Sequence, residues 1–324
     1  MSTAAAPALV TLDAIREAAQ RLDGVARLTP VLAASTDEGW RHLRLKCENL
    51  QLAGAFKLRG AFNFISQLDQ GARSRGVLTY SSGNHGQAVA WAARRLSLAS
   101  TVVMPTTAPA VKVEGARALG AEVRFAGLTT IDRQLAAEAL ERERGLAMVP
   151  PFDDPRIIAG QGTVGLEIVA QQPDVTTVYV PLGGGGLASG VAAAVKGLRG
   201  GVRVVGVEPE GAPKMSRSLA AGHPVTLDSV QTMADGLMAV RPGDLTFAHV
   251  RALVDEVVTV SEGEIAAGVR FLAAHAKVVA EPSGAASVAA AMRMAPPGSP
   301  GVHVAVVSGG NVAMDRLAAL LSLV

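Results

Sequence analysis

The stretch VYVPLGGGGLASG, residues 178–190, places four consecutive glycines directly after an apolar run. Each glycine loses more backbone freedom on folding than any other residue, so a block of four is costly to order. A strand that ends in bare glycines before a helix can hold a phosphate group, because successive N–H groups converge on the anion and the helix dipole favours negative charge. The stretch is not a P-loop, and Ala188 stands where the dinucleotide fingerprint needs glycine. Taken alone, it fits a phosphate site or a closely packed strand–helix connection.

Short apolar runs alternate with segments of helical length on both sides of this stretch. Continuous apolar strands joined by helical crossovers indicate parallel sheets covered on both faces, so we expect an α/β fold. The expected strands are residues 43–46, 77–80, 101–104, 122–125, 178–181, 204–207, 257–260 and 302–307. The expected helices include residues 61–68, 88–96, 111–119, 131–144 and 264–274.

Three glycine-rich turns directly follow expected strands. They are SSGNHG (81–86), LGGGG (182–186) and SGGN (308–311). In open α/β sheets, ligands bind beyond the carboxyl ends of the strands, where the N-termini of helices point. We therefore expect these turns to lie at a ligand-binding edge.

The composition is that of a packed globular protein. The 324 residues are 49% hydrophobic and 18% charged, which is untypical of a disordered chain. The formal net charge is only +2, no dense run of Lys and Arg occurs, and aromatic residues make up 3%. These features argue against a nucleic-acid partner.

The cysteine content and the apolar segments indicate in which cellular compartment the protein resides. Cys47 is the only cysteine, which excludes an internal disulfide bond and fits a reducing environment. The opening residues MSTAAAPALV lack the basic and apolar regions of a signal peptide. Residues 175–195 carry no charge and are long enough to span a bilayer, but they contain five glycines and Pro181. We therefore expect a cytoplasmic protein without a membrane partner.

A second motif, GAFKLRGA (54–61), places Lys57 after the apolar Phe56 and before a helical stretch. When the stem of a lysine lies against an apolar wall at a helix start, desolvation and the helix dipole disfavour its charged form. Such a lysine is a candidate for Schiff-base formation. An isolated lysine is more often a solvated surface residue, so the motif depends on its context.

Six motifs in a fixed order supply that context. They are ENLQLAGAFKLRGA (48–61), SSGNHGQA (81–88), AGQGT (159–163), GGGGLASG (183–190), EPSGA (281–285) and SGGN (308–311). Together they resemble the threonine dehydratase and serine racemase group of fold-type II pyridoxal-phosphate enzymes, from about residue 15 to the end of the chain.

The resemblance implies a tryptophan synthase β-like fold, with two open twisted parallel-sheet domains and flanking helices. The implied large domain, residues 1–73 and 155–324, binds the cofactor. The implied small domain, residues 74–154, closes over the substrate.

The resemblance also assigns residues to the cofactor, pyridoxal 5'-phosphate. Lys57 would form a Schiff base with it, and the glycine block would hold its phosphate group. Asn84 would hydrogen-bond the 3'-oxygen of the pyridine ring, Ser308 would face the pyridine nitrogen, and Glu281 would lie near the ring. The full set of implied cofactor residues is Lys57, Phe56, Asn84, Gly183, Gly184, Gly185, Gly186, Glu281 and Ser308.

A second set is implied for the amino-acid substrate, namely Ser81, Ser82, Asn84, His85, Asp235 and Gly236. The turn that carries Ser81, Asn84 and His85 opens a helix and would receive the substrate carboxylate. Asp235 and Gly236 would shape the site near the substrate β-carbon. The implied catalytic residues are Lys57 and Ser82, because racemases of this group keep a second proton carrier at the position of Ser82.

One departure from the family pattern bears on a possible metal site. VEPEGAPKM (207–215) aligns with a divalent-cation loop of the metal-dependent members, whose ligands are oxygen atoms. Glu208 and Ala212 match two of these ligands, but Lys214 replaces the acidic third ligand. An ammonium group cannot bind a cation, so we expect no metal here and the Lys214 ammonium near Glu208 in place of the ion. The alternative is a Lys214 side chain that points into solvent.

The chemistry implied by this resemblance is β-elimination. Pyridoxal phosphate withdraws electrons from the substrate Cα, and the protein decides which bond breaks. Lys57, released as an amine when substrate binds, is placed to take the Cα proton. A serine is a weak partner for the pyridine nitrogen, which favours prompt loss of a β-hydroxyl group. We therefore expect a lyase that converts a β-hydroxy amino acid, such as L-threonine or L-serine, to a 2-oxo acid and ammonia.

Two other functions stay open. A serine-type racemase would use Lys57 and Ser82 on opposite faces of the Cα, and a regulatory protein would bind the cofactor without turnover. The resemblance also implies a homodimer, without identifying its interface. The sequence does not determine the β-substituent of the substrate or whether a divalent or monovalent cation activates the protein.

Overall fold

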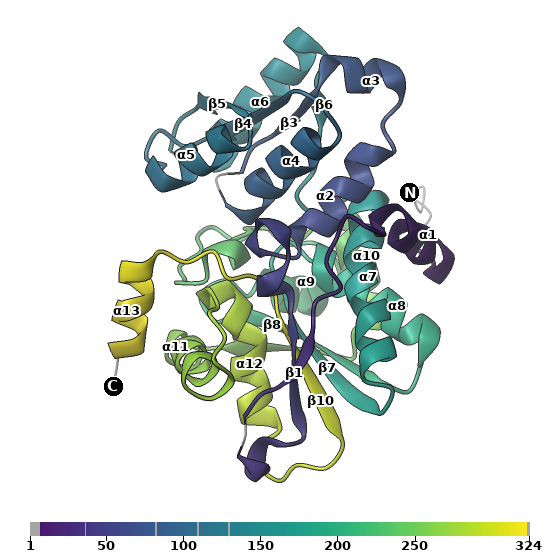
Figure 1. Ribbon diagram of the computed structural model, residues 1–324, viewed down its shortest axis with the longest axis vertical. Helices are drawn as coiled ribbons and strands as arrows, with labels where there is room; N and C mark the ends of the chain where they lie inside the picture. The colour runs from purple at the N-terminus through teal and green to yellow at the C-terminus, as the bar shows by residue number, and fades with distance from the viewer. Residues whose placement is uncertain (1–6, 36, 82, 109, 129, 323–324) are drawn as a thin grey trace.

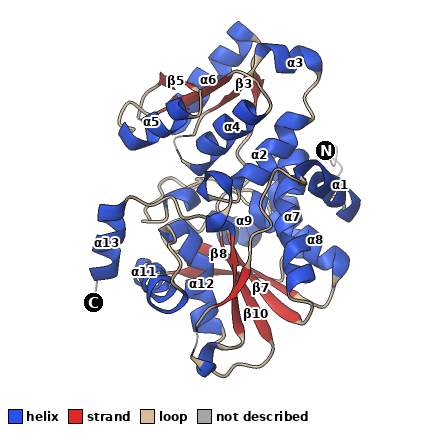
Figure 2. Ribbon diagram, in the orientation of Figure 1, coloured by secondary structure: helices blue, strands red, loops and turns tan. Residues whose placement is uncertain are grey.

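The computed structural model describes residues 7–35, 37–81, 83–108, 110–128 and 130–322, and their strands form two sheets (Figures 1 and 2). The larger sheet has six strands in the order β1-β2-β10-β7-β8-β9. They are β1 (Val31–Ala33), β2 (Leu43–Cys47), β10 (Val302–Val307), β7 (Val175–Pro181), β8 (Arg203–Pro209) and β9 (Glu256–Val260). All neighbours are parallel except β1, which pairs antiparallel with β2 at the sheet edge.

The smaller sheet has four parallel strands in the order β5-β4-β3-β6. They are β5 (Glu122–Phe125), β4 (Ser100–Met104), β3 (Val77–Thr79) and β6 (Ala147–Met148). This sheet and its helices lie at one end of the molecule, and the larger sheet lies at the other (Figure 1).

Helices cover both faces of the larger sheet because its central strands are apolar on both sides. Tyr179 of β7 packs with one group of helices, whereas its neighbours Val178 and Val180 pack with the other. The first group is α11 (Glu262–Phe271), α12 (Pro282–Met294) and α13 (Met314–Ser322), with a π-turn η5 (Leu272–Ala276). The second group is α7 (Pro155–Gln171), α8 (Gly186–Leu198), α9 (Lys214–Ala221) and α10 (Asp244–Leu253). The N-terminal helix α1 (Leu12–Leu22) packs on α7 and α8.

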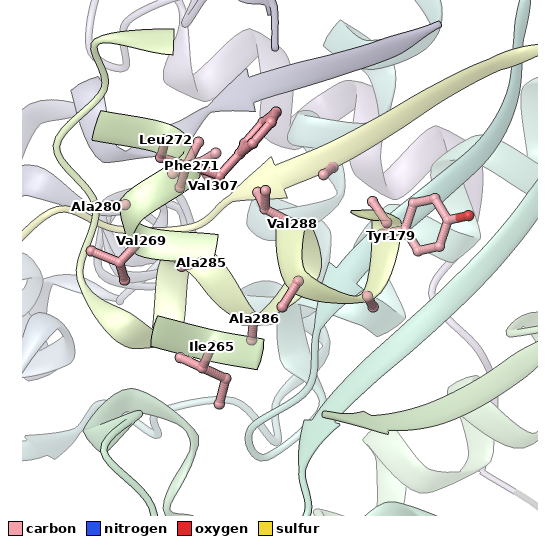
Figure 3. Packing of buried hydrophobic residues seen from close by; sticks show 14 of the residues in the cluster. Tyr179, Ile265, Val269, Phe271, Leu272, Ala280, Ala285, Ala286, Val288 and Val307 are labelled. Atoms are coloured by element: carbon pink, nitrogen blue, oxygen red, sulfur yellow. The ribbon is translucent and has the colours of Figure 1, made fainter. Parts of the chain in front are cut away.

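The core on the first face is built largely from small and branched side chains. Ala285, Ala286 and Val288 of α12 meet Ile265 and Val269 of α11 there, as Figure 3 shows. Small side chains on α12 let it lie close to α11 and to the sheet, which keeps the start of α12 near the carboxyl ends of the strands.

The remaining helices surround the smaller sheet or connect the two sheets. They are α2 (Lys57–Ser66), α3 (Gln70–Arg75), α4 (Asn84–Arg95), α5 (Ala110–Ala118) and α6 (Thr130–Arg144). The described chain also has the short turns η1 (Glu38–Trp40), η2 (Glu48–Leu50), η3 (Leu52–Gly54) and η4 (Asp235–Leu237). Within the described residues, no helix has the length and apolar character needed to cross a bilayer.

The sequence predicted the main strands, and the differences concern short elements. Every expected strand is present to within a few residues, including β7, which starts three residues before the expected residue 178. The strands β1 and β6 were not expected, since three and two residues carry too little periodicity to read. The antiparallel β1 also makes the larger sheet mixed rather than purely parallel.

A buried ionic network fixes α2, the helix that starts at Lys57. The guanidinium group of Arg59 donates hydrogen bonds to the carboxylates of Glu48, at 2.8 Å, and Glu167 of α7, at 2.6 Å. Lys46 of β2 contacts the same Glu167 at 2.5 Å. Although burial raises the pKa of Glu48, the adjacent Arg59 holds it below its usual value. The network therefore links β2, η2, α2 and α7 through buried charges that neutralise one another.

We predict that Arg59→Met destabilises the protein by about 3–5 kcal/mol, because it leaves the buried Glu48 carboxylate without its counter-ion. Urea denaturation of the purified protein measures this change. The matched control is Arg293→Met, since Arg293 forms an exposed pair with Glu264 whose contribution should stay below about 1 kcal/mol. Equal effects of the two substitutions would contradict the role assigned to the network.

Candidate active site

Segments that follow strands of both sheets meet at one edge of the larger sheet. β7 leads into Gly183–Gly186, β10 leads into Ser308, and β3 leads into the turn before α4. Ala55, just before α2, forms a bridge with Gly309, and the Phe56 N–H donates to the Ser308 carbonyl at 3.1 Å. The site residues predicted from separate motifs are therefore brought together at the carboxyl ends of the strands, where α/β folds bind ligands.

The glycine block packs too closely against other residues to carry side chains. A Cβ on Gly184 would lie 2.2 Å from the ring of Phe152, and one on Gly183 would lie 3.0 Å from the Gly236 carbonyl oxygen. Gly185 has φ +103°, a left-handed conformation that glycine adopts without strain, and it caps α8 without a side-chain hydrogen bond. Among the described residues, none accepts a hydrogen bond from the N–H groups of this block. Unpartnered donors at a helix start are the arrangement that binds anions in proteins, so the block is a candidate anion site.

Lys57 is the first residue of α2 and is only partly exposed. Its Nζ donates to the carbonyl oxygen of Pro151 at 2.6 Å and lies 5.3 Å from the centre of the Phe56 ring. Burial lowers the pKa of Lys57 to about 8, and no carboxylate of the described chain pairs with it. Pro151 directly precedes Phe152, the residue that packs on the glycine block. One short segment therefore contacts both the Lys57 amine and the glycine block.

Four of the predicted substrate residues lie in the sequence at or just before the start of α4: Ser81, Ser82, Asn84 and His85. His85 is buried, its Nε2 lies 3.0 Å from the Val149 carbonyl oxygen, and burial together with the charge of Lys57 lowers its pKa to about 3. The ring is therefore neutral near pH 7, with Nε2–H as the donor to Val149. Ser81 accepts a hydrogen bond from the Gly83 N–H at 3.3 Å, and α4 begins at Asn84 without a side-chain cap. Ser82, the second predicted catalytic residue, lies outside the described residues.

Asn84 belongs to a chain of side-chain hydrogen bonds. Its Nδ2 donates to Glu281 Oε1 at 2.6 Å, and its Oδ1 accepts from Asn311 at 2.9 Å. Burial and the nearby Asp235 raise the pKa of Glu281 to about 8, so its carboxyl group is largely protonated at neutral pH. The Oγ of the buried Ser308 lies 3.5 Å from the carbonyl oxygen of Ser283.

Asp235 and Gly236 lie in the turn η4, next to this chain of hydrogen bonds. The Gly236 N–H donates to the Ser283 hydroxyl at 2.8 Å. The Asp235 carboxylate pairs at 3.3 Å with Lys112 of α5, a helix that packs on the smaller sheet. This ion pair links the two parts of the molecule beside the site.

Some residues that support the glycine block were not predicted from the sequence. Thr246 of α10 donates its hydroxyl hydrogen to the Gly184 carbonyl at 2.7 Å. The Asp153 carboxylate accepts hydrogen bonds from three successive N–H groups at the start of α10, at 3.0–3.1 Å. Neighbouring acidic residues in a loop indicate a helix cap, but no sequence signal shows that Asp153 caps a helix 91 residues away.

Lys214 lies among the oxygen atoms predicted for it. Its Nζ is 3.2 Å from the Glu208 carboxylate and donates to the Ala212 carbonyl at 3.1 Å. An ammonium group thus takes the space between these oxygens, and a divalent cation does not fit there beside it. No group of three or more His, Cys, Asp or Glu side chains with metal-binding geometry occurs in the described part of the chain.

The comparisons with known proteins agree with this geometry. The family model described as "pyridoxal-phosphate dependent enzyme" matches residues 21–309. The chain belongs to this family. It is 43% identical over 311 residues to the L-threonine ammonia-lyase of Thermotoga maritima, which covers 95% of the chain and 77% of that relative. It is 40% identical over 308 residues to the L-threo-3-hydroxyaspartate ammonia-lyase of a Pseudomonas species, covering 94% and 96%. The structure of maize serine racemase superposes with a TM-score of 0.91 at 39% identity, covering 96% of this chain and 97% of that one.

The predicted family, fold class and cofactor are thereby confirmed, and the protein is a pyridoxal-phosphate dependent enzyme. The residues of this site fit the cofactor. The N–H donors of Gly183–Gly186, which have no acceptor among the described residues, suit a phosphate. The Lys57 amine is hydrogen-bonded to the carbonyl of Pro151, the residue before Phe152, and Phe152 packs on the glycines. When bound, pyridoxal phosphate supplies an electron sink for the substrate Cα. The individual roles given to the site residues remain predictions.

We predict that Gly184→Ala weakens the affinity for pyridoxal phosphate by at least about tenfold, because the new methyl group collides with Phe152 and shifts the phosphate donors. Fluorescence titration of the apoprotein measures the dissociation constant. Gly201→Ala is the control, since no atom lies within 4 Å of its Cβ position. An unchanged affinity in Gly184→Ala would argue against the glycine block as the phosphate site.

A second prediction concerns the ionisation of Lys57. Since burial lowers its pKa to about 8, the reactive neutral amine should increase as the pH rises through 8 rather than through the ordinary 10.5. Apoprotein is mixed with pyridoxal phosphate, and the covalent product is trapped with borohydride at a series of pH values. We expect a half-maximal initial rate near pH 8, and no trapped product in Lys57→Ala. A midpoint near the ordinary lysine pKa would contradict the burial of this amine.

Proposed function

We propose that this protein is an ammonia-lyase that removes the β-hydroxyl group from a β-hydroxy amino acid such as L-threonine or L-serine, giving a 2-oxo acid and ammonia. The observation that carries the proposal is the Lys57 amine, which is buried, lacks a carboxylate partner among the described residues and adjoins the anion site. The ammonia-lyase relatives support the same reaction class.

Lys57 is the group proposed to move the Cα proton. A base works best when its pKa lies near the working pH, because it is then both available and strong enough to take a proton. The lowered pKa of about 8 meets this requirement, whereas an exposed lysine would stay protonated. The hydrogen bond to the Pro151 carbonyl holds Nζ in one position while it carries a proton.

The start of α4 is proposed to hold the substrate carboxylate. The first N–H groups of a helix have no partner within it and attract anions. His85 supports this turn in its neutral form, since its Nε2–H is directed to the Val149 carbonyl. Ser81 and Asn84 supply further polar groups at the same turn.

We also propose that residues 74–154 form a small domain that closes over the substrate, against a large domain of residues 1–73 and 155–324. Two contacts between these parts support the division. One is the Lys112–Asp235 ion pair at 3.3 Å, and the other is the Asn84–Glu281 hydrogen bond at 2.6 Å. Both include predicted site residues, so movement of the small domain would change the site directly.

Serine racemisation is the second candidate function. The serine pair Ser81-Ser82 offers a hydroxyl group on a different segment from Lys57, and the similarity to maize serine racemase favours this possibility. Racemisation needs a second proton carrier, whereas elimination from an L-amino acid needs only Lys57. Substitution of Ser82 therefore separates the two activities.

The proposal also covers the cellular location and the oligomeric state of the protein. We propose a cytoplasmic location, on the basis of the single cysteine, Cys47, which is buried and unpaired. We propose a homodimer from the resemblance to the family alone. Neither nucleic acid nor a membrane is a proposed partner.

The test is release of 2-oxo acid from a panel containing L-threonine, L-serine and L-threo-3-hydroxyaspartate, with D-serine formation followed in parallel. We expect L-threonine or L-serine to be the better substrate, because the Asp235 carboxylate near the proposed β-carbon position repels a second substrate carboxylate. Lys57→Ala should abolish all turnover. Ser82→Ala should keep 2-oxo acid release from the L-isomers and lose D-serine formation. A wild-type protein that binds cofactor and turns over none of these amino acids would refute the proposal.

A further inference from the structure

Lys214 is fully buried, and oxygen atoms surround its ammonium group. Nζ donates to the carbonyl oxygens of Leu182 at 2.8 Å, Ala212 at 3.1 Å and Leu237 at 3.2 Å, and it lies 3.2 Å from Glu208 Oε1. We call this set, Lys214 Nζ with its three carbonyls and the Glu208 carboxylate, the ammonium cage. Carbonyl and carboxylate oxygens are the ligands of hard cations such as Ca²⁺. The cage therefore has the oxygen groups of a cation site, and its cation is the ammonium group of Lys214 itself.

The cage joins segments that form the active site. Leu182 directly precedes the glycine block, and Leu237 directly follows Asp235 and Gly236. The two segments touch nearby as well, since a Cβ on Gly183 would lie 3.0 Å from the Gly236 carbonyl oxygen. Carbonyl dipoles that point at one another repel, and the positive charge of Lys214 between these two carbonyls offsets that repulsion.

The hydrogen bonds around the cage require a cation. A carbonyl oxygen only accepts, and a charged lysine offers three donors for the three carbonyls. Glu208 spends its other lone pairs on the start of α9, accepting from the Met215 N–H at 2.8 Å and the Ser216 N–H at 2.9 Å. Burial lowers the pKa of Lys214, and the Glu208 carboxylate counteracts this effect. The pair thus balances charge in a region without water-exposed atoms.

We propose that Lys214 is a positioning residue whose ammonium serves as a built-in cation, holding the glycine block and the Asp235–Leu237 turn in the geometry that binds the cofactor phosphate. The protein then needs no dissociable metal at this place. The same oxygens should bind a metal ion once the ammonium is replaced by a carboxylate. A glutamate joined to Ca²⁺ by a bond of about 2.3 Å has nearly the reach of a lysine side chain.

The experiment compares Lys214→Glu with wild type in the presence of EDTA or millimolar CaCl₂. We expect Lys214→Glu to bind about one Ca²⁺ per chain by calorimetry, and its unfolding temperature to rise by about 3–6 °C with CaCl₂. The wild type should show neither effect. Lys196→Glu is the matched control, because Lys196 also contacts a carbonyl, of Val202, and a carboxylate, of Asp255, but has only those two oxygen groups in the part of the chain that the structure describes. These readouts do not depend on the proposed reaction.

A second variant covers the case in which Lys214→Glu does not fold. Glu208→Gln/Lys214→Met removes both charges, so no unpaired buried charge remains and the fold is kept. We expect its affinity for pyridoxal phosphate to fall about tenfold or more, with a smaller loss in Gly201→Ala. Wild-type cofactor affinity in the double variant, a folded Lys214→Glu that ignores Ca²⁺, or a wild type stabilised by Ca²⁺ like Lys214→Glu would each overturn the proposal.

Discussion

The rest of the site depends on a steric constraint, the space that Gly183–Gly186 must leave empty. Phe152 occupies the volume where side chains of Gly184 and Gly186 would stand, and Thr246 crowds the Cβ position of Gly185. Because nothing but backbone fits, the N–H groups at the start of α8 stay open to an anion. Phe152 and the turn η4 pack directly against this loop. Through Phe152, the same packing helps to position Pro151, which contacts Lys57.

Three buried cations illustrate how partners decide the role of a charged group. Arg59 has two carboxylates and serves the fold. Lys214 has carbonyl oxygens and one carboxylate, and it joins two loops. Among the described residues, Lys57 donates to a single carbonyl oxygen, so burial disfavours its charged form and lowers its pKa to about 8. The least compensated of the three is the one suited to chemistry, because a proton can leave it at little cost.

Ammonia-lyases and a racemase are all similar to this chain, which agrees with the physical division of labour in the family. The cofactor supplies the electron sink, and the scaffold that holds it is common to different reactions. Differences in outcome must then come from a few side chains around the substrate. The residues proposed for this role are Ser82, which precedes α4 in the sequence, and Asp235 with its partner Lys112.

The sequence alone determined the α/β class and the main strands, and it indicated which segments meet at the candidate site, because periodicity and the glycine-rich motifs are local properties of the chain. It also indicated Lys57, which stands in one of the six motifs, and the replacement of an acidic ligand by Lys214, which departs from the family's cation loop. Tertiary structure decided what depends on long-range contact: the antiparallel edge strand β1, the wall that Phe152 forms behind the glycines, and the Leu182 and Leu237 carbonyls around Lys214. Backbone carbonyls exist at every residue and carry no sequence signal, so only the fold reveals where they converge.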